Sequence, residues 1–296
     1  MAGNKIKTSF SEKIFDSTNT LFMIIFCMTT LYPFVYLLSM SLASANVPLT
    51  QLYLIPPEIS FESYKRVFSS NYIASGFLVT IYKTILGTLL SVLFTFTLAY
   101  PLSRKYFPNR GFWTALVVFT MFFSGGLIPN YLLVRNLGLM NSINALVLPN
   151  LVNAFYMTIV RNYMMSLPDS LEESAKIDGA NDIRILVSII LPICKPIIAT
   201  IALWIAVWHW NEWFQCLLYI TDPSKQVLQV IMRRVVMEGT QQVMDLSGQS
   251  EVEAAAVTTE GVKAATIMVT TIPILIVYPF IQKYFVKGIM VGSLKG

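Results

Sequence analysis

Hydrophobic residues along this chain gather in six long blocks, and they do not recur every three to four positions as they would on a water-facing helix. About 20 apolar residues, each rising 1.5 Å along a helix, cross the hydrocarbon core of a bilayer. The blocks therefore predict an all-α integral membrane protein with six transmembrane helices. The predicted spans are Leu21–Leu42, Phe77–Pro101, Phe112–Val134, Ile143–Val160, Ile185–Trp210 and Ala264–Gln282.

Charged residues interrupt these spans at only two positions, Lys83 and Lys195. Both lie near a span end, so we expect their long side chains to reach the membrane interface. The fourth span has the weakest pattern, because Pro149 and several asparagines interrupt it. Prolines in other spans would kink helices in ways that neighbouring helices can accommodate.

Composition agrees with a bilayer environment. Of the 296 residues, 55% are hydrophobic and 12% are charged, whereas soluble domains carry about twice that charged fraction. The net charge of +5 comes from scattered basic residues, so it does not indicate nucleic-acid binding. The three cysteines, Cys27, Cys194 and Cys216, lie in or beside apolar blocks, and we expect free thiols packed among helices.

The distribution of Lys and Arg predicts the orientation of the chain. With the N-terminus in the cytoplasm, twelve of the 21 basic residues fall on the inner side, seven on the outer side and two within spans. Because cytoplasmic loops carry the excess of positive charge, we expect both termini in the cytoplasm. This gives an N-terminal tail at 1–20, a first helix at 21–42, a membrane core at 77–282 and a C-terminal tail at 283–296.

The N-terminus has a second possible interpretation. Lys5, Lys7 and Lys13 precede an apolar run, and Ala43-Ser44-Ala45 has the small-x-small form of a signal-peptide cleavage site. The run is longer than the roughly 7–15 residues usual for a signal peptide, and further spans follow it. We therefore expect an uncleaved first helix.

Two segments on the predicted outer side are long enough to fold. Phe61, Tyr64 and Phe68 would share one helical face, which could lie along the outer interface. The segment Asp222–Lys263 has apolar residues at helical spacing, namely Val227, Leu228, Ile231, Val235 and Val236. Both segments could pack against the ends of the spans, or could contact another protein.

The inner segment between the fourth and fifth spans has a helix–turn–helix pattern. Pro168 suits the first turn of a helix, and Ser170 with Glu173 resembles a capping box. The run Asp178-Gly179-Ala180-Asn181 is typical of a turn, and Asp182 can cap the second helix. Taken alone, this pattern favours an ordinary amphipathic connector.

The particular residues of this segment resemble the "EAA…G…I.LP" signature of ABC-importer permeases, with Ser174 in place of the first alanine. The resemblance implies a type I ABC importer permease fold. It also implies that the segment 167–184 is a coupling helix received by a groove on a cytoplasmic ATPase. The residues that it assigns to this coupling are Glu173, Ser174, Ala175, Asp178, Gly179, Ala180, Ile189, Leu191 and Pro192.

Other stretches resemble the MalG-type branch of carbohydrate permeases. These stretches are Ile55-Pro56-Pro57 with Phe61–Tyr64, Trp208–Phe214 and Tyr284–Gly296. Phe122–Pro129 with Leu137-Gly138-Leu139 resembles a sub-branch linked to oligosaccharides from plant and other acidic polysaccharides. The branch implies a MalF-like permease partner, two ATPases that bind ATP-Mg, an extracellular solute-binding protein and a bacterial cytoplasmic membrane. We expect no cofactor or metal in this chain itself.

A sugar pathway is a weaker prediction. Sugars stack their C–H faces on aromatic rings and bond their hydroxyl groups to amides, so Trp and Asn suit them. Candidates at the outer end of the fifth span and in the fourth are Trp204, Trp208, Asn211, Trp213, Asn150 and Asn153. The tryptophans could instead form an aromatic belt, and the asparagines could bond across helices. His209 we expect to be a packing or interface residue.

Two other functional classes remain to be weighed. Secondary transporters and channels generally place carboxylates or histidines at mid-membrane, but no Asp or Glu falls inside a predicted span. Membrane enzymes need a catalytic motif such as H-E-x-x-H or G-x-S-x-G, and the sequence contains neither. A G-x-x-x-x-G-K-[ST] loop is also missing, so ATP hydrolysis would come from a partner.

Overall fold

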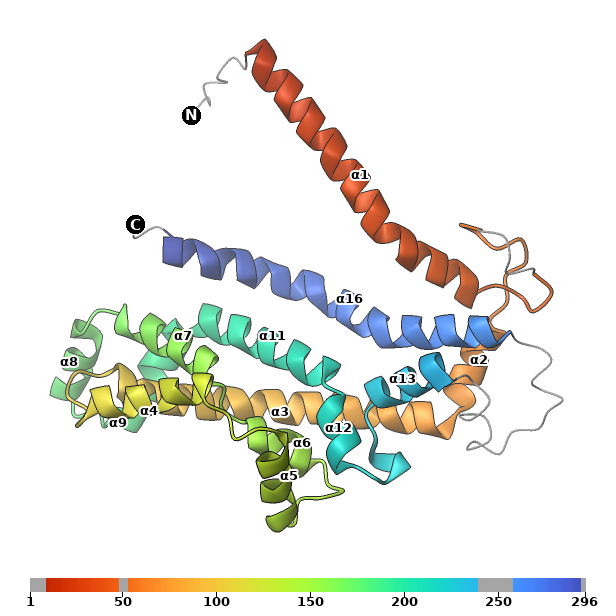
Figure 1. Cartoon of the computed structure of the whole chain (residues 1–296). Helices are drawn as coiled ribbons and strands as arrows, with labels where there is room; N and C mark the ends of the chain where they lie inside the picture. Colours follow the sequence, from red (N-terminus) through yellow and green to blue (C-terminus); the bar gives the residue numbers. More distant parts are fainter. Residues whose placement is uncertain (1–8, 48–52, 239–257, 294–296) are drawn as a thin grey trace. The chain divides into compact units, whose positions relative to one another are not determined.

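The computed structural model describes residues 9–47, 53–238 and 258–293 of the chain (Figure 1). The predicted tails and the outer segment Asp222–Lys263 fall partly outside these ranges. Two compact units are present: Met1–Ser69 with Gly239–Val269, and Ser70–Glu238 with Thr270–Gly296. Among the described residues helices are the only extended regular structure, and the single β-bridge joins Ala43 to Ile59. The all-α prediction is therefore confirmed for this part of the chain.

The first unit contains α1 (Phe10–Ser41), α2 (Glu62–Ser69) and the start of α16 (Thr259–Ser293). A capping box formed by Ser9 and Glu12 starts α1, so this helix begins well before the predicted span. Tyr64 of α2 bonds to Ser41 at 2.8 Å. The helix expected around Phe61–Phe68 is therefore present.

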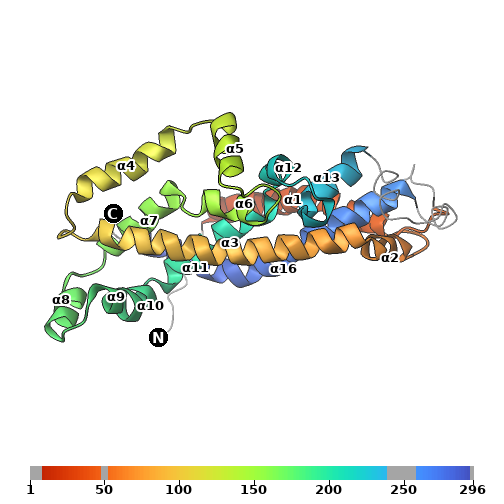
Figure 2. The same cartoon turned by 90° about the horizontal axis from the view of Figure 1, so that it is seen from below.

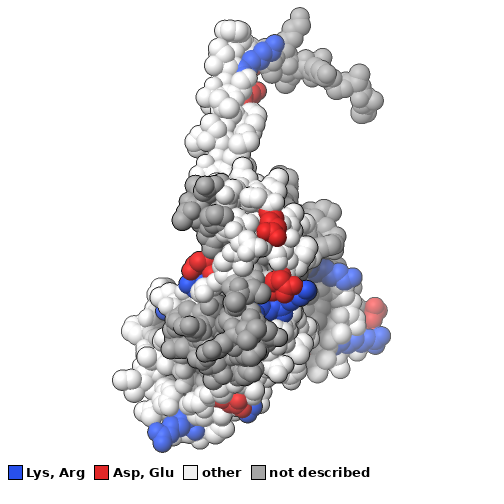
Figure 3. Space-filling view, turned by 90° about the vertical axis from the view of Figure 1, so that its right-hand side faces the viewer, with Lys and Arg blue, Asp and Glu red and all other residues white. Residues whose placement is uncertain are grey.

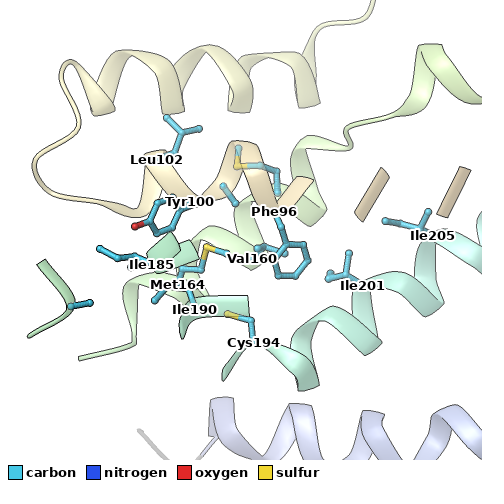
Figure 4. Packing of buried hydrophobic residues seen from close by; sticks show 13 residues of the cluster. Phe96, Tyr100, Leu102, Val160, Met164, Ile185, Ile190, Cys194, Ile201 and Ile205 are labelled. Carbon is cyan, nitrogen blue, oxygen red and sulfur yellow. The ribbon is translucent and has the colours of Figure 1, made fainter. Parts of the chain in front are cut away.

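The second unit is built along α3 (Asn71–Ser103), which lies beside α7 (Ala154–Met165) and α11 (Lys195–Asn211) in Figures 1 and 2. Where the three helices meet, apolar side chains form one buried cluster, shown in Figure 4, with Phe96, Val160, Met164 and Ile201 among its members. In the same unit α13 (Leu228–Glu238) packs on α3, which confirms the helical spacing seen from Val227 to Val235.

Glycine on α3 lets another helix approach closely. A methyl group at Gly87 would clash with the ring of His209, whose side chain is fully buried. A larger residue at position 87 would therefore force one of the two helices or the His209 ring to move. His209 is therefore a packing residue, as the sequence indicated.

The predicted span Phe112–Val134 is wrong as a continuous helix. The structure contains α4 (Arg110–Phe122) and α5 (Leu127–Asn136), which meet at a bend of 113°. Between them Gly126 has a φ of +85°, a conformation open to glycine but costly for other residues. The apolar run continues through the break, and for that reason hydrophobicity alone did not reveal it.

The fourth predicted span, Ile143–Val160, is also not one helix. It consists of α6 (Asn144–Val147), the 3₁₀ turn Leu148–Asn150 and then α7. Asn153 starts α7 by accepting hydrogen bonds from the N–H groups of Phe155 and Tyr156, at 2.9 and 3.3 Å. Pro149, which has no N–H to donate, lies in the 3₁₀ turn.

The fifth predicted span, Ile185–Trp210, bends by 83° at Cys194. Before the bend lie α9 (Asp182–Ile185), the π-helical turn Leu186–Ile190 and α10 (Leu191–Ile193). After α11 come α12 (Phe214–Tyr219) and the 3₁₀ turn Pro223–Lys225. The prolines at the starts of α10 and α11 cannot donate backbone hydrogen bonds, which accounts for the break.

Three described helices are long and apolar enough to cross a bilayer, namely α1, α3 and the Thr259–Ile276 part of α16, or up to five if each bent pair counts as one span. On the face drawn in Figure 3, charged side chains are few and lie in small separate groups. All three cysteines are free, as expected, although Cys27 is exposed rather than packed.

Candidate functional site

The predicted helix–turn–helix lies at one end of the second unit, as α8 (Ser170–Ile177) followed by α9 (Figure 2). Gly179 after α8 has a φ of +78°. The Gly179 N–H donates to the carbonyl of Lys176 at 3.0 Å, and the Ala180 N–H to that of Ala175 at 2.9 Å. These two bonds form a Schellman motif, which confirms the predicted turn and fixes the direction of the chain into α9.

The predicted caps of the two helices are displaced by one residue. Ser170 is the first helical residue rather than the N-cap, and Asp169 before it makes no side-chain cap hydrogen bond. Asn181 caps α9 by accepting a bond from the Arg184 N–H at 2.9 Å, so Asp182 is not the cap. Asp169 instead accepts a hydrogen bond from Lys105, and Asp182 accepts one from the Tyr106 hydroxyl. Lys105 and Tyr106 both lie in the segment between α3 and α4.

Ion pairs attach α8 to the end of α3. Arg104 Nη1 lies 2.9 Å from Glu172 Oε1 with both side chains buried, and Lys105 pairs with Asp169 at 2.8 Å. Burial raises the pKa of Glu172, and the positive charge of Arg104 opposes that shift. The hydrogen bond from Lys105 lowers the pKa of Asp169. Displacement of α8 would therefore be transmitted to α3.

The coupling residues predicted around α8 divide between two faces. Four of them are exposed, namely Glu173, Ser174, Asp178 and Gly179. Ala175 is buried, and Ala180 packs partly against the hydrophobic cluster. The exposed residues are thus available to another protein, whereas the two alanines hold the element to its own chain.

Two exposed isoleucines extend this surface. Ile177 at the end of α8 is 86% exposed and Ile183 in α9 is 73% exposed. The sequence interpretation did not include these two residues, although a large apolar side chain on the face of α8 opposite the buried Ala175 was a usable signal. Large apolar side chains left in water are typical of a surface that another protein covers.

The second half of the signature lies behind the turn. Ile189 and Leu191 pack partly against the buried cluster, while Pro192 is exposed at the start of α10. These three residues are therefore placed to shape the bent connection from α9 to α11.

All six predicted pathway residues line two neighbouring cavities of the second unit. The first cavity, of about 680 Å³, is lined by Trp204, Trp208, Asn211 and Trp213, among others. The second, of about 330 Å³, is lined by Asn150 and Asn153 and again by Trp208. Asn150 also donates to Gln215 Oε1 at 2.8 Å, so it bonds across elements as well.

Lys83 does not reach the interface as expected. Its side chain is fully buried, and Nζ lies 3.1 Å from the Glu212 carbonyl and 3.4 Å from Glu212 Oε2. Glu212 Oε1 accepts a further bond from the Gln215 N–H at 2.6 Å, and Glu212 lines the first cavity. A pair that is 129 residues apart could not be found from local pattern. Lys195, by contrast, is exposed.

Comparison with known proteins identifies relatives along nearly the whole chain. The protein LplC of Bacillus subtilis is 41% identical over 287 residues, which cover 96% of each chain. The polygalacturonan/rhamnogalacturonan transport system permease protein YtcP of the same organism is 40% identical over 286 residues, covering 96% of this chain and 99% of YtcP. Models of protein families give no match.

A solved structure has the same fold. It is a crystal structure of a bacterial ABC transporter involved in the import of the acidic polysaccharide alginate, and the matching chain superimposes with a TM-score of 0.86. The two chains are 34% identical, and the match covers 95% of this chain and all of the other.

Bent apolar helices, an exposed helix–turn–helix and these matches define a multi-pass membrane permease. More narrowly, the chain belongs to the family of permease subunits of binding-protein-dependent ABC importers for carbohydrates.

Proposed function

We propose that this permease imports oligosaccharides derived from acidic plant or other polysaccharides, as the MalG-type member of a heterodimer. Two relatives support this substrate class, since YtcP is named for polygalacturonan and rhamnogalacturonan and the structural neighbour imports alginate. The complete importer would add a MalF-like permease, two cytoplasmic ATPases that bind ATP-Mg and an extracellular solute-binding protein. Hydrolysis of ATP belongs to the ATPases, so this subunit is not itself an enzyme.

The proposed topology has six spans with both termini in the cytoplasm of a bacterium. The excess of basic residues on the inner side supports the orientation. Counting α6 and α7 as a broken fourth span brings the helices that could cross the membrane to six. The helix–turn–helix then lies on the cytoplasmic face.

In this arrangement the exposed surface of Glu173, Ser174, Ile177, Asp178 and Gly179 docks into the ATPase. Closure of the ATPase pair on ATP moves α8, and the buried Arg104–Glu172 pair carries that motion to α3. The result is a shift of population between inward-facing and outward-facing states, driven by the different affinity of each state for ATP.

The two cavities along α11 are proposed to contact the sugar. Trp204, Trp208 and Trp213 supply ring faces, and Asn150 and Asn211 supply amides. This mixture of apolar faces and a few polar groups suits a carbohydrate. Glu212 lines the first cavity, and its ion pair with the buried Lys83 neutralises its negative charge. The cavity wall therefore does not repel an acidic sugar.

The coupling proposal is tested at Gly179, in the reconstituted importer with its partners. Gly179→Leu should abolish sugar-stimulated ATP hydrolysis while the subunit still enters the membrane, because the side chain would project from the docking surface. Gly138→Leu is the matched control, since Gly138 also has a positive φ, +68°, and open space around it. Equal stimulation in both variants contradicts the docking role, and uptake by this chain alone without ATP contradicts the importer assignment in favour of an ion-gradient-driven transporter.

A further inference from the structure

A cavity of about 230 Å³ lies between the end of α3, the start of α4 and the inner side of α8. A water molecule occupies about 30 Å³ of liquid, so the cavity has room for a group of several heavy atoms. The residues that line it are mostly of polar or charged types, although their aliphatic and ring carbons supply much of the wall; they include Arg104, Lys105, Arg110 and Lys176. The coupling proposal uses the Arg104–Glu172 pair at the wall of this cavity, but it gives no role to Arg110 or to the space that the cavity encloses.

Two arginines of this lining have hydrogen-bond donors without acceptors. Arg104 is 4% exposed, and its Nε and Nη2 are buried without a partner, since only Nη1 faces Glu172. Arg110 has an Nη1 that is buried and equally unpaired. A buried donor left unsatisfied costs about 1–3 kcal/mol, and more when it is charged. Such donors around one cavity indicate an acceptor that occupies it.

The charges around the cavity leave Arg110 without a carboxylate. Of the three carboxylates that line the cavity, Glu172 is paired with Arg104 and Asp169 with Lys105, while Glu173 is exposed. Lys176 lies over the ring of Tyr106 at 3.7 Å and pairs with Asp182 at 3.8 Å. Among the described ion pairs none includes Arg110. The site therefore has a cation that an anionic ligand would neutralise.

The start of α4 adds further positive potential. Arg110 is the first residue of this 13-residue helix, and Asn109 before it makes no side-chain cap hydrogen bond. The N-terminus of a helix carries a partial positive charge and N–H groups that point outward, so it favours phosphate. A third guanidinium group lies near the end of α3, since Arg161 Nε donates to the Leu102 carbonyl at 2.8 Å.

From these observations we propose that the cavity binds a phosphate group through Arg104 and Arg110. Guanidinium groups match phosphate oxygens in geometry, and basic pockets between membrane helices on the cytoplasmic side bind anionic lipid headgroups. The phosphate could come from an anionic phospholipid or from a soluble phosphate compound. Either source would satisfy the unpaired donors and tie the α3–α4 segment to the base of α8.

Two variants separate this site from the fold of the subunit. Arg110→Gln removes the cation that has no carboxylate partner. Arg104→Lys keeps a positive charge beside Glu172 but removes the two unpaired donors. Lys225→Gln is the matched control, because it removes a basic residue that is partly exposed and remote in sequence from this cavity.

The experiment is native mass spectrometry of the intact importer in nanodiscs that contain either phosphatidylglycerol with phosphatidylcholine or phosphatidylcholine alone. We expect phosphatidylglycerol to remain bound to the wild type and to the control, and its apparent affinity to fall about tenfold or more in each variant, as loss of a charge-assisted hydrogen bond implies. In phosphatidylcholine alone, a titration with inorganic phosphate, read as a rise in melting temperature, tests the soluble source.

Retention of phosphatidylglycerol that depends on Arg104 and Arg110 supports a lipid phosphate. Stabilisation by inorganic phosphate that depends on the same residues, without retained lipid, supports a soluble compound. If neither probe distinguishes the variants from the control, the proposal is overturned. Both readouts are binding measurements, so they succeed or fail independently of the coupling proposal.

Discussion

Replacing Lys83 by methionine should destabilise the subunit strongly. The change leaves the Glu212 carboxylate, whose side chain is 8% exposed, without its cation, and removes the bond from Lys83 Nζ to the Glu212 carbonyl. Breaking a buried ion pair by removing one partner costs about 3–5 kcal/mol, because the remaining charge stays buried. The double variant Lys83→Met with Glu212→Gln should recover most of this loss, since no buried charge remains and the Gln215 N–H keeps an acceptor.

The assay is thermal unfolding of the purified importer, with Lys195→Met as the control. Lys195 is an exposed lysine of the same chain, so its replacement should change stability by no more than about 0.5 kcal/mol. A loss of 3 kcal/mol or more corresponds to a drop of several degrees in the apparent Tm. The reasoning fails if Lys83→Met unfolds at the same temperature as Lys195→Met. It also fails if the double variant is no more stable than Lys83→Met, because the two changes would then not be coupled.

Three other changes test separate parts of the structure. Ile177→Asp places a charge on the docking surface and should abolish sugar-stimulated ATP hydrolysis without altering Tm; unchanged stimulation would remove Ile177 from the docking surface. Gly87→Ala forces a methyl group against His209 and should cost about 1–3 kcal/mol of stability, which thermal unfolding would measure and an unchanged Tm would contradict. Because Lys105 lowers the pKa of Asp169, their pairing stabilises the attachment of α8 at higher pH and is lost as the pH falls below the usual Asp value of 3.8. Hydrogen exchange of α8 in the wild type should therefore approach that of Asp169→Asn at low pH and differ from it near neutrality.

Much of the helical content could be predicted, because apolar blocks in a chain with few charges indicate membrane helices. The turn at Gly179 was also predictable, since glycine and its polar neighbours specify it locally. The break at Gly126 was not, because two glycines in an apolar run do not lower hydrophobicity enough to be noticed. Hydrophobic periodicity and charge indicate that a segment is a membrane helix, but they give less information about the position of a bend within it.

Pairing between distant segments could not be predicted at all. Lys83 was expected at the interface because a lone lysine in a span usually reaches it, and its partner Glu212 follows a helix far along the chain.

The six pathway residues were chosen by chemistry, and the structure places all of them around two cavities. The exposed Ile177 could not be predicted from the signature, because the signature specifies acidic and small residues in α8 and no apolar residue at position 177.

The separation of the two faces of α8 has an evolutionary consequence. The side chains of Glu172 and Ala175 are buried within their own chain, whereas those of Glu173, Ser174 and Ile177 are exposed and do not pack in its core. If the exposed positions dock an ATPase as proposed, substitutions there can accumulate together with changes in that ATPase, without a cost in permease folding. A subunit built in this way can exchange one ATPase for another, or share one among several importers, while its membrane helices stay the same.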